Sequence, residues 1–147
     1  MINPEAERLY EEGVRAVASG NTLVALVHLE KAALLTQSPV ICSYLGYCLA
    51  KERGGVRKGM ALCQEAIKAE PRNSVHYLNL GRVLIVAGRK REAIDTFRLG
   101  LKQGKNREIT RELERLGTRR EPVLSFLERE SLLNRFLGRM FARLGLR

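Results

Sequence analysis

The stretch that decides the fold is residues 74–101, SVHYLNLGRVLIVAGRKREAIDTFRLGL. Its first part holds apolar side chains at helical spacing, at Tyr77, Leu80 and Leu84. Gly88 interrupts this period, and residues 92–101 then resume it. The stretch therefore predicts two helices joined by a short turn.

Four positions of this stretch recur along the chain with a period of 34 residues. The four sets are Gly20, Gly54 and Gly88; Ala25, Gly59 and Ala93; Leu29, Cys63 and Phe97; and Ala32, Ala66 and Gly100. A period in this range is typical of repeat arrays, because a single helix pair cannot bury both of its apolar faces alone. We therefore expect three stacked helix pairs with a long concave surface, an architecture that rarely carries chemistry.

At these residues the chain resembles the tetratricopeptide repeat family. That family places a large residue, Leu-Gly and a further large residue on its first helix, small residues and an aromatic on its second, and a closing proline. The third copy follows the pattern at Tyr77, Leu80, Gly81, Leu84, Ala93, Phe97 and Gly100, and the second at Cys42, Leu45, Gly46, Leu49, Gly59, Cys63, Ala66 and Pro71. The first copy follows it more weakly at Leu9, Gly13, Ala16, Gly20, Ala25, Leu29 and Ala32, with Glu12 where leucine is expected. The resemblance implies an all-α, right-handed superhelix of helix-turn-helix repeats and, by analogy of fold alone, a protein-binding scaffold.

The copies are not evenly spaced. Gly13 and Gly46 are 33 residues apart, whereas Gly46 and Gly81 are 35 apart. We interpret this as two irregularities. The linker after the first copy is one residue shorter than in the regular repeat, and the turn at Gly54-Gly55 is one residue longer. The predicted repeats cover about 6–38, 39–73 and 74–107 of a domain spanning 5–117, with a capping helix over 107–116 and a basic tail over 118–147.

Composition and charge limit the function classes. The net charge is +10, and residues 105–147 hold eleven basic against six acidic side chains. The amino terminus lacks the basic start and apolar run of a signal peptide, and no stretch reaches the ~18 apolar residues of a membrane span. We expect a cytoplasmic protein. Nothing interleaves aromatic residues with arginines as single-strand binders do, so nucleic acid is disfavoured as a partner.

No catalytic or metal-binding pattern stands out. Cys42, Cys48 and Cys63 form no Cys-x-x-Cys pair, and the two histidines stand alone, so we expect no metal and no cofactor. Ser43 and His76 belong to no known nucleophile motif, and His76 is expected at an exposed helix position. The chain is predicted not to be an enzyme.

The family resemblance implies that the first helix of each copy lines a concave groove. Carried onto this chain, the partner-binding residues are Tyr10, Val14 and Val17; Ser43, Tyr47 and Lys51; and Leu78, Arg82 and Ile85. Tyr10 and Val14 stand where co-chaperone members carry the lysine and asparagine of a carboxylate clamp, so that clamp is absent. The resulting groove is largely apolar with a few cations. It suits an amphipathic helix, or an extended apolar peptide with an acidic residue.

The tail holds a predicted amphipathic helix over 132–144. Its interaction residues are Arg135, Phe136, Leu137, Arg139, Met140 and Arg143. Such a helix can pack on its own repeats, associate with a second chain, enter a partner's groove or lie on a membrane. The tail also resembles those of small bacterial proteins of this repeat family, and that likeness implies no activity.

The sequence thus supports a non-enzymatic adaptor whose groove binds a protein segment, oriented by Lys51 and Arg82. The alternative is a peripheral membrane or nucleic-acid binder acting through the basic tail.

Overall fold

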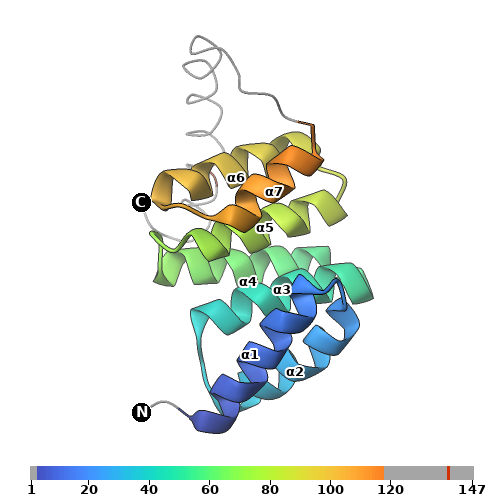
Figure 1. Cartoon of the computed structure of the whole chain (residues 1–147), viewed down its shortest axis with the longest axis vertical. Helices are drawn as coiled ribbons and strands as arrows, with labels where there is room; N and C mark the ends of the chain where they lie inside the picture. Colours follow the sequence, from blue (N-terminus) through green and yellow to red (C-terminus); the bar gives the residue numbers. More distant parts are fainter. Residues whose placement is uncertain (1–2, 118–138, 140–147) are drawn as a thin grey trace.

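The computed structural model describes residues 3–117 and Arg139. Within 3–117 the helices are α1 (Pro4–Ala18), α2 (Thr22–Leu35), α3 (Pro39–Arg53), α4 (Val56–Ala69), α5 (Ser74–Val86), α6 (Lys90–Gln103) and α7 (Arg107–Arg115). They stack as three antiparallel pairs into a superhelical array, with α7 against the last pair (Figure 1). No helix among the described residues has the length and apolar character needed to cross a membrane. The all-α repeat architecture expected from the spacing is confirmed.

The recurring glycines mark the turns inside the pairs. Gly20, Gly54 and Gly88 have φ of 81°, 66° and 74°, a left-handed conformation that side chains with a Cβ rarely adopt. Asparagines begin several helices: the Asn3 and Asn106 side chains each accept two backbone N–H bonds, at the starts of α1 and α7. Turn glycines and helix caps therefore follow the sequence period.

The uneven spacing has two origins. The linker after the first pair, residues 36–38, is shorter than the linker after the second, residues 70–73, as expected. The extra residue of the second copy, however, was wrongly assigned to its turn. It lies inside α3, which continues to Arg53 and leaves only Gly54 and Gly55 before α4. The left-handed Gly54 ends α3 because its backbone departs from helical dihedrals there.

Two clusters of buried side chains run through the array. The N-terminal core joins the first and second pairs and comprises Leu9, Ala16, Val17, Ala25, Leu26, Leu29, Ala32, Ile41, Tyr44, Cys48 and Leu49. The C-terminal core joins the second and third pairs and comprises Ala50, Cys63, Ile67, Tyr77, Leu78, Leu80, Val83, Leu84, Ala93, Phe97, Leu99 and Ile109. Each core spans neighbouring pairs, so no pair is buried without the next.

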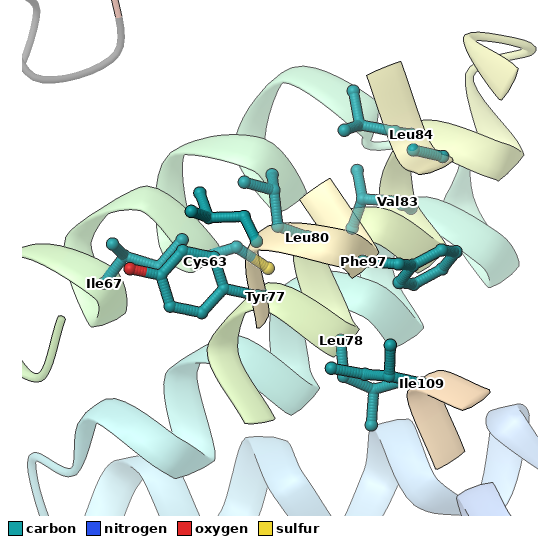
Figure 2. Packing of buried hydrophobic residues seen from close by; sticks show 12 residues of the cluster. Cys63, Ile67, Tyr77, Leu78, Leu80, Val83, Leu84, Phe97 and Ile109 are labelled. Carbon is teal, nitrogen blue, oxygen red and sulfur yellow. The ribbon is translucent and has the colours of Figure 1, made fainter. Parts of the chain in front are cut away.

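Glycines allow close approach within the pairs. In the second pair, a Cβ on Gly46 would lie 2.6 Å from the carbonyl oxygen of Gly59, so the α3 and α4 backbones nearly touch. In the third pair, a Cβ on Gly81 would overlap the ring of Phe97, which is completely buried among leucine and valine side chains (Figure 2). These positions tolerate no side chain without displacement of a core neighbour.

Helix α7 closes the array. Ile109 is completely buried, and its Cδ1 would lie only 2.7 Å from a Cβ on Gly100. The Asn106 amide donates to the hydroxyl of Ser74 at 3.1 Å. Apart from Ile109, its side chains are partly or fully exposed. The helix is therefore apolar toward the last pair and polar outside, as an end cap needs to be.

Candidate partner-binding groove

A row of contacting side chains crosses the first helices of the pairs. Tyr10 of α1 meets Tyr44 of α3 edge to face, with ring centroids 6.1 Å apart and planes at 61°. One turn further along α3, Tyr47 lies under the guanidinium of Arg82 from α5, 5.3 Å from the ring centroid. Such cation–π contacts add to apolar packing. The row thus joins the first helices of successive pairs.

Arg82 continues the row onto α7. Its Nη2 lies 2.9 Å from an oxygen of Glu108, and its Nε lies 3.2 Å from an oxygen of Glu112. The side chain of Arg82 is only 11% exposed, and that of Glu112 is 17% exposed. Shielding from water strengthens such charge-assisted bonds, so Arg82 fastens α7 to α5.

Acidic side chains of α1 and α7 act on the tyrosines of the row. Burial raises the pKa of Tyr10, with the charges of Glu7 and then Glu108 adding to the effect. Burial followed by the charge of Glu108 likewise raises the pKa of Tyr44. The charge of Glu108 on α7 thus acts on tyrosines of both α1 and α3.

Five of the nine predicted groove residues offer surface here. Tyr10, Val14, Tyr47 and Ile85 are half-buried, and Lys51 is exposed. Val17, Ser43 and Leu78 were predicted wrongly as surface, since they are 8%, 0% and 1% exposed. In a tightly curved array the neighbouring first helix covers the flanks of each helix, so only the centre of its inner face remains open.

Arg82 already has partners within the described chain. It was expected to orient a partner through its charge, but its guanidinium already contacts Tyr47, Glu108 and Glu112. Sequence reasoning missed the two glutamates because they were assigned only to the polar side of a cap. Glu108 and Glu112 are four residues apart, so they share one face of α7, and their charge is opposite to that of Arg82. That pattern was the available signal for an ion pair between them and Arg82.

A buried polar chain lies behind the row. Ser43 Oγ is 3.0 Å from His76 Nδ1, and His76 Nε2 is 2.8 Å from Glu70 Oε1. Asn79 donates to the same serine oxygen at 3.1 Å. Because Nε2 must carry a proton to donate to Glu70, Nδ1 of the neutral ring is an acceptor, and it shares the Ser43 hydroxyl proton with the carbonyl of Val40. His76, expected to be exposed, is completely buried, because the α5 face it occupies packs on α3.

The order serine, histidine, carboxylate resembles a hydrolase triad, but the arrangement is structural. The Ser43 side chain is completely buried, and its oxygen already contacts His76, Asn79 and the carbonyl of Val40 at 3.2 Å. A substrate carbonyl cannot reach a nucleophile that is enclosed by two helices. These bonds pair Ser43, His76 and the Asn79 NH2 group where the second and third pairs meet.

A hollow of about 240 Å³ adjoins Tyr10 at one end of the row. It lies between the starts of α1 and α3 and is lined by Asn3, Ala6, Glu7, Tyr10, Thr36, Ser38, Val40 and Ile41. The shortened linker after the first pair contributes to its wall. Sequence reasoning could not find this hollow, because its lining residues come from three separate segments.

A second hollow of about 670 Å³ lies at the other end of the array. It is lined by Leu101, Lys105, Asn106, Arg107, Thr110, Arg111 and Glu114. Its three cations, Lys105, Arg107 and Arg111, make this hollow basic, unlike the apolar row.

The predicted tail residues Arg135, Phe136, Leu137, Met140 and Arg143 fall outside the described residues, whereas Arg139 is helical and exposed.

The described residues provide no metal site or reactive thiol. None of their histidine, cysteine and acidic side chains gather in groups of three that could hold a metal ion. Burial, followed by the charge of Glu52, raises the pKa of Cys48 to about 12, and burial also raises the pKa of Cys63. Such thiols stay protonated at neutral pH and pack as small apolar groups.

Comparison with family models finds no match to this chain. A search of curated proteins by sequence also finds no match. Solved structures do match: the tetratricopeptide repeat domain of Sgt2 from Aspergillus fumigatus superposes with a TM-score of 0.57 and 19% identity, over 82% of this chain and 86% of that one. The helix pairs, turn glycines and end cap described above agree with that likeness. The chain therefore has the fold of a tetratricopeptide repeat domain.

Proposed function

We propose that this protein is a non-enzymatic cytoplasmic scaffold whose concave face binds a peptide or helical segment of another protein. The observation that carries the proposal is the row from Tyr10 to Arg82, which offers half-buried aromatic and aliphatic surface beside a hollow. Aromatic side chains supply much of the binding energy at protein interfaces, because they bury a large area with few rotatable bonds.

The groove suggests the chemistry of the segment. The hollow next to Tyr10 is walled by Ala6, Val40 and Ile41, and its volume suits one apolar side chain. Lys51 is the exposed cation among the predicted groove residues, so an acidic residue of the segment would pair with it. Arg82 contributes its flat contact with Tyr47 rather than a free charge.

A displayed library of random peptides tests the proposal. Peptides selected on the full-length protein are expected to share an apolar anchor and an acidic residue. Their affinity should fall at least tenfold for Lys51→Glu, whose side chain is exposed, and for Val14→Asp. Val14 is half-buried against the N-terminal core, so a circular-dichroism melt must show that this variant stays folded. Lys68→Glu, on the exposed side of α4, is the matched charge control and should bind as the unaltered protein does.

Failure to select any peptide, or equal loss of binding for Lys68→Glu, would contradict groove binding.

The tail gives a second candidate function, because residues 118–147 hold seven basic against three acidic side chains. Binding of that segment to an anionic membrane or nucleic acid would weaken steeply as salt rises. Groove binding driven by apolar burial would change little over the same range.

A further inference from the structure

Helix α2 exposes more apolar side chains than its two counterparts in the array. Leu23, Val24, Val27, Leu34 and Leu35 are 59%, 42%, 46%, 86% and 40% exposed. Lys31 is exposed as well and adds one charged side chain to these five apolar ones. These six residues, here called the α2 stripe, point away from α1 and α3, the helices against which α2 packs. Single exposed leucines are ordinary, but a contiguous apolar patch on a helix marks a contact surface.

The 34-residue period supplies an internal control. On α4 the positions of Leu23, Val24 and Leu34 are held by Arg57, Lys58 and Lys68, all exposed. On α6 the same positions hold Arg91, Glu92 and Lys102. At these three positions a charged side chain is therefore the default for a second helix in this array, while the positions of Val27 and Leu35 hold alanine on α4. The α2 stripe departs from that default at each of the three positions, so its apolar character is not a requirement of the fold.

The positions of the stripe are symmetric along the sequence of α2 about Leu29, which is itself buried. Leu23 and Leu35 are equally distant from Leu29 along the helix, and so are Val24 and Leu34. The third symmetric pair is Val27 and Lys31. When two copies of one helix pack antiparallel about a two-fold axis, each residue meets its symmetric counterpart. Leucine would then face leucine or valine, and the Lys31 stem would cover Val27 while its ammonium stays in water.

Charge favours a second copy over a membrane at this surface. Residues 3–35 hold three basic and five acidic side chains, a net charge of −2. Residues 36–117 hold sixteen basic and eight acidic side chains, a net charge of +8. An anionic lipid surface attracts cations and would not select the one acidic helix pair. Contact through this pair instead keeps the cationic parts of two copies far apart, which limits their repulsion.

We propose that the α2 stripe is a self-association surface, through which two copies of this chain pack α2 against α2 in antiparallel orientation. Helix α7, at which the continuous described array ends, packs against α6 of the last pair, whereas α2 belongs to the first. The stripe extends about 18 Å along the helix, at 1.5 Å per residue. One helix pair of this length buries less than the roughly 1,200 Å² of stable complexes, so the dimer is weak and concentration-dependent.

Sedimentation velocity of the full-length protein, over a hundredfold range of concentration, tests the proposal. The unaltered protein should shift from monomer toward dimer as concentration rises. The triple variant Leu23→Arg, Val24→Lys and Leu34→Lys should remain monomeric throughout. It carries the side chains that α4 already bears at the equivalent positions, so its helix content and melting should be retained.

A matched control adds the same charge elsewhere. Ala61→Lys, Ala69→Lys and Val86→Lys lie at exposed positions outside the stripe and should dimerise like the unaltered protein. Orientation is tested by mixing a Val24→Cys chain with a Leu34→Cys chain. The mixture should form a disulfide-linked dimer under mild oxidation, and each variant alone should do so much less.

Three results would overturn the proposal. The first is an unaltered protein that stays monomeric over the whole range. The second is a triple variant that dimerises as the unaltered protein does. The third is a monomeric protein whose melting falls in the triple variant, which would show that a segment of the same chain covers α2. Crosslinking of each cysteine variant with itself as fast as in the mixture would exclude the antiparallel register.

Discussion

The N-terminal and C-terminal cores have the same architecture but are stabilised by different interactions. In the N-terminal core the pairs meet through apolar side chains, and its polar links lie at the edge, where Arg53 contacts Glu30 at 2.7 Å and Thr22 donates to Glu52. In the C-terminal core, Ser43, His76 and Asn79 are completely buried beside Phe97 and Leu80. One junction depends mainly on burial of apolar area, and the other also on a polar chain enclosed by helices.

This difference has consequences for specificity and for stability. Apolar surfaces tolerate small shifts of one helix on another, whereas a buried hydrogen-bonded chain is satisfied in one arrangement only. The second junction is therefore expected to be the more rigid, and the more sensitive to substitution and to pH. The predictions below compare matched changes in the two cores.

The largest difference is expected at the close-approach glycines. Gly81→Ala should lower the free energy of unfolding by about 1–3 kcal/mol, because its Cβ would lie 2.2 Å from a carbon of the buried ring of Phe97. Urea denaturation followed by circular dichroism measures this loss.

Gly13→Ala is the counterpart in the N-terminal half. Its Cβ would lie 2.8 Å from Cγ of the buried Leu29, so this side chain must shift, but by less than the ring of Phe97 would have to. Alanine also gains about 1 kcal/mol over glycine within a helix, so the net change should be near zero. Equal losses at Gly81 and Gly13 would show that the two cores pack with the same tolerance.

The buried polar chain should give the next largest difference. Ser43→Ala removes the partner of both His76 Nδ1 and the Asn79 amide, and should cost about 1–3 kcal/mol because both groups stay buried. Thr22→Val removes the Thr22 bond to Glu52 at the edge of the N-terminal core. Glu52 is exposed and regains water, so this change should cost about 1 kcal/mol or less. A larger loss at Thr22 than at Ser43 would contradict the comparison.

Much of the fold could be predicted from the sequence, because the positions that define it are local and periodic. Gly88 ends α5 and Phe97 packs on Gly81, and both follow from spacing within one repeat. The groove was harder to predict. Tyr10, Val14, Tyr47, Lys51 and Ile85 keep exposed or half-exposed surface, while Val17, Ser43 and Leu78 are enclosed.

The reason is that exposure on the inner face depends on curvature, which the period of one repeat does not determine. The stacking of α7 on the last pair also brings Glu108 to Arg82, a contact between segments that have no shared motif. A serine and a histidine 33 residues apart show no signal in the sequence, yet the stacking of α5 on α3 places them in hydrogen-bond contact. Long-range polar contacts were thus the part that spacing could not predict.

The smallest effect, and the most specific to the C-terminal core, concerns pH. Burial lowers the pKa of His76 below its usual 6.5, although the hydrogen bond and charge of Glu70 partly oppose this effect. The folded protein therefore keeps His76 neutral under conditions in which the unfolded chain takes up a proton. The resulting stability is fully present above pH 6.5 and is lost as pH falls from 6.5 toward the folded pKa.

Urea denaturation at pH 7.5 and 5.5 measures this effect when the unaltered protein is compared with His76→Gln. The glutamine cannot take up a proton in this range, so the difference in unfolding free energy between the two proteins should shrink at the lower pH. The shift can reach at most about 1.4 kcal/mol per pH unit, the value for one proton, and Glu70 should reduce it. Carboxylates elsewhere titrate in both proteins and cancel in the comparison. If the difference grows as pH falls, the protonated ring is favoured in the folded state, and the Glu70 bond outweighs the burial of His76.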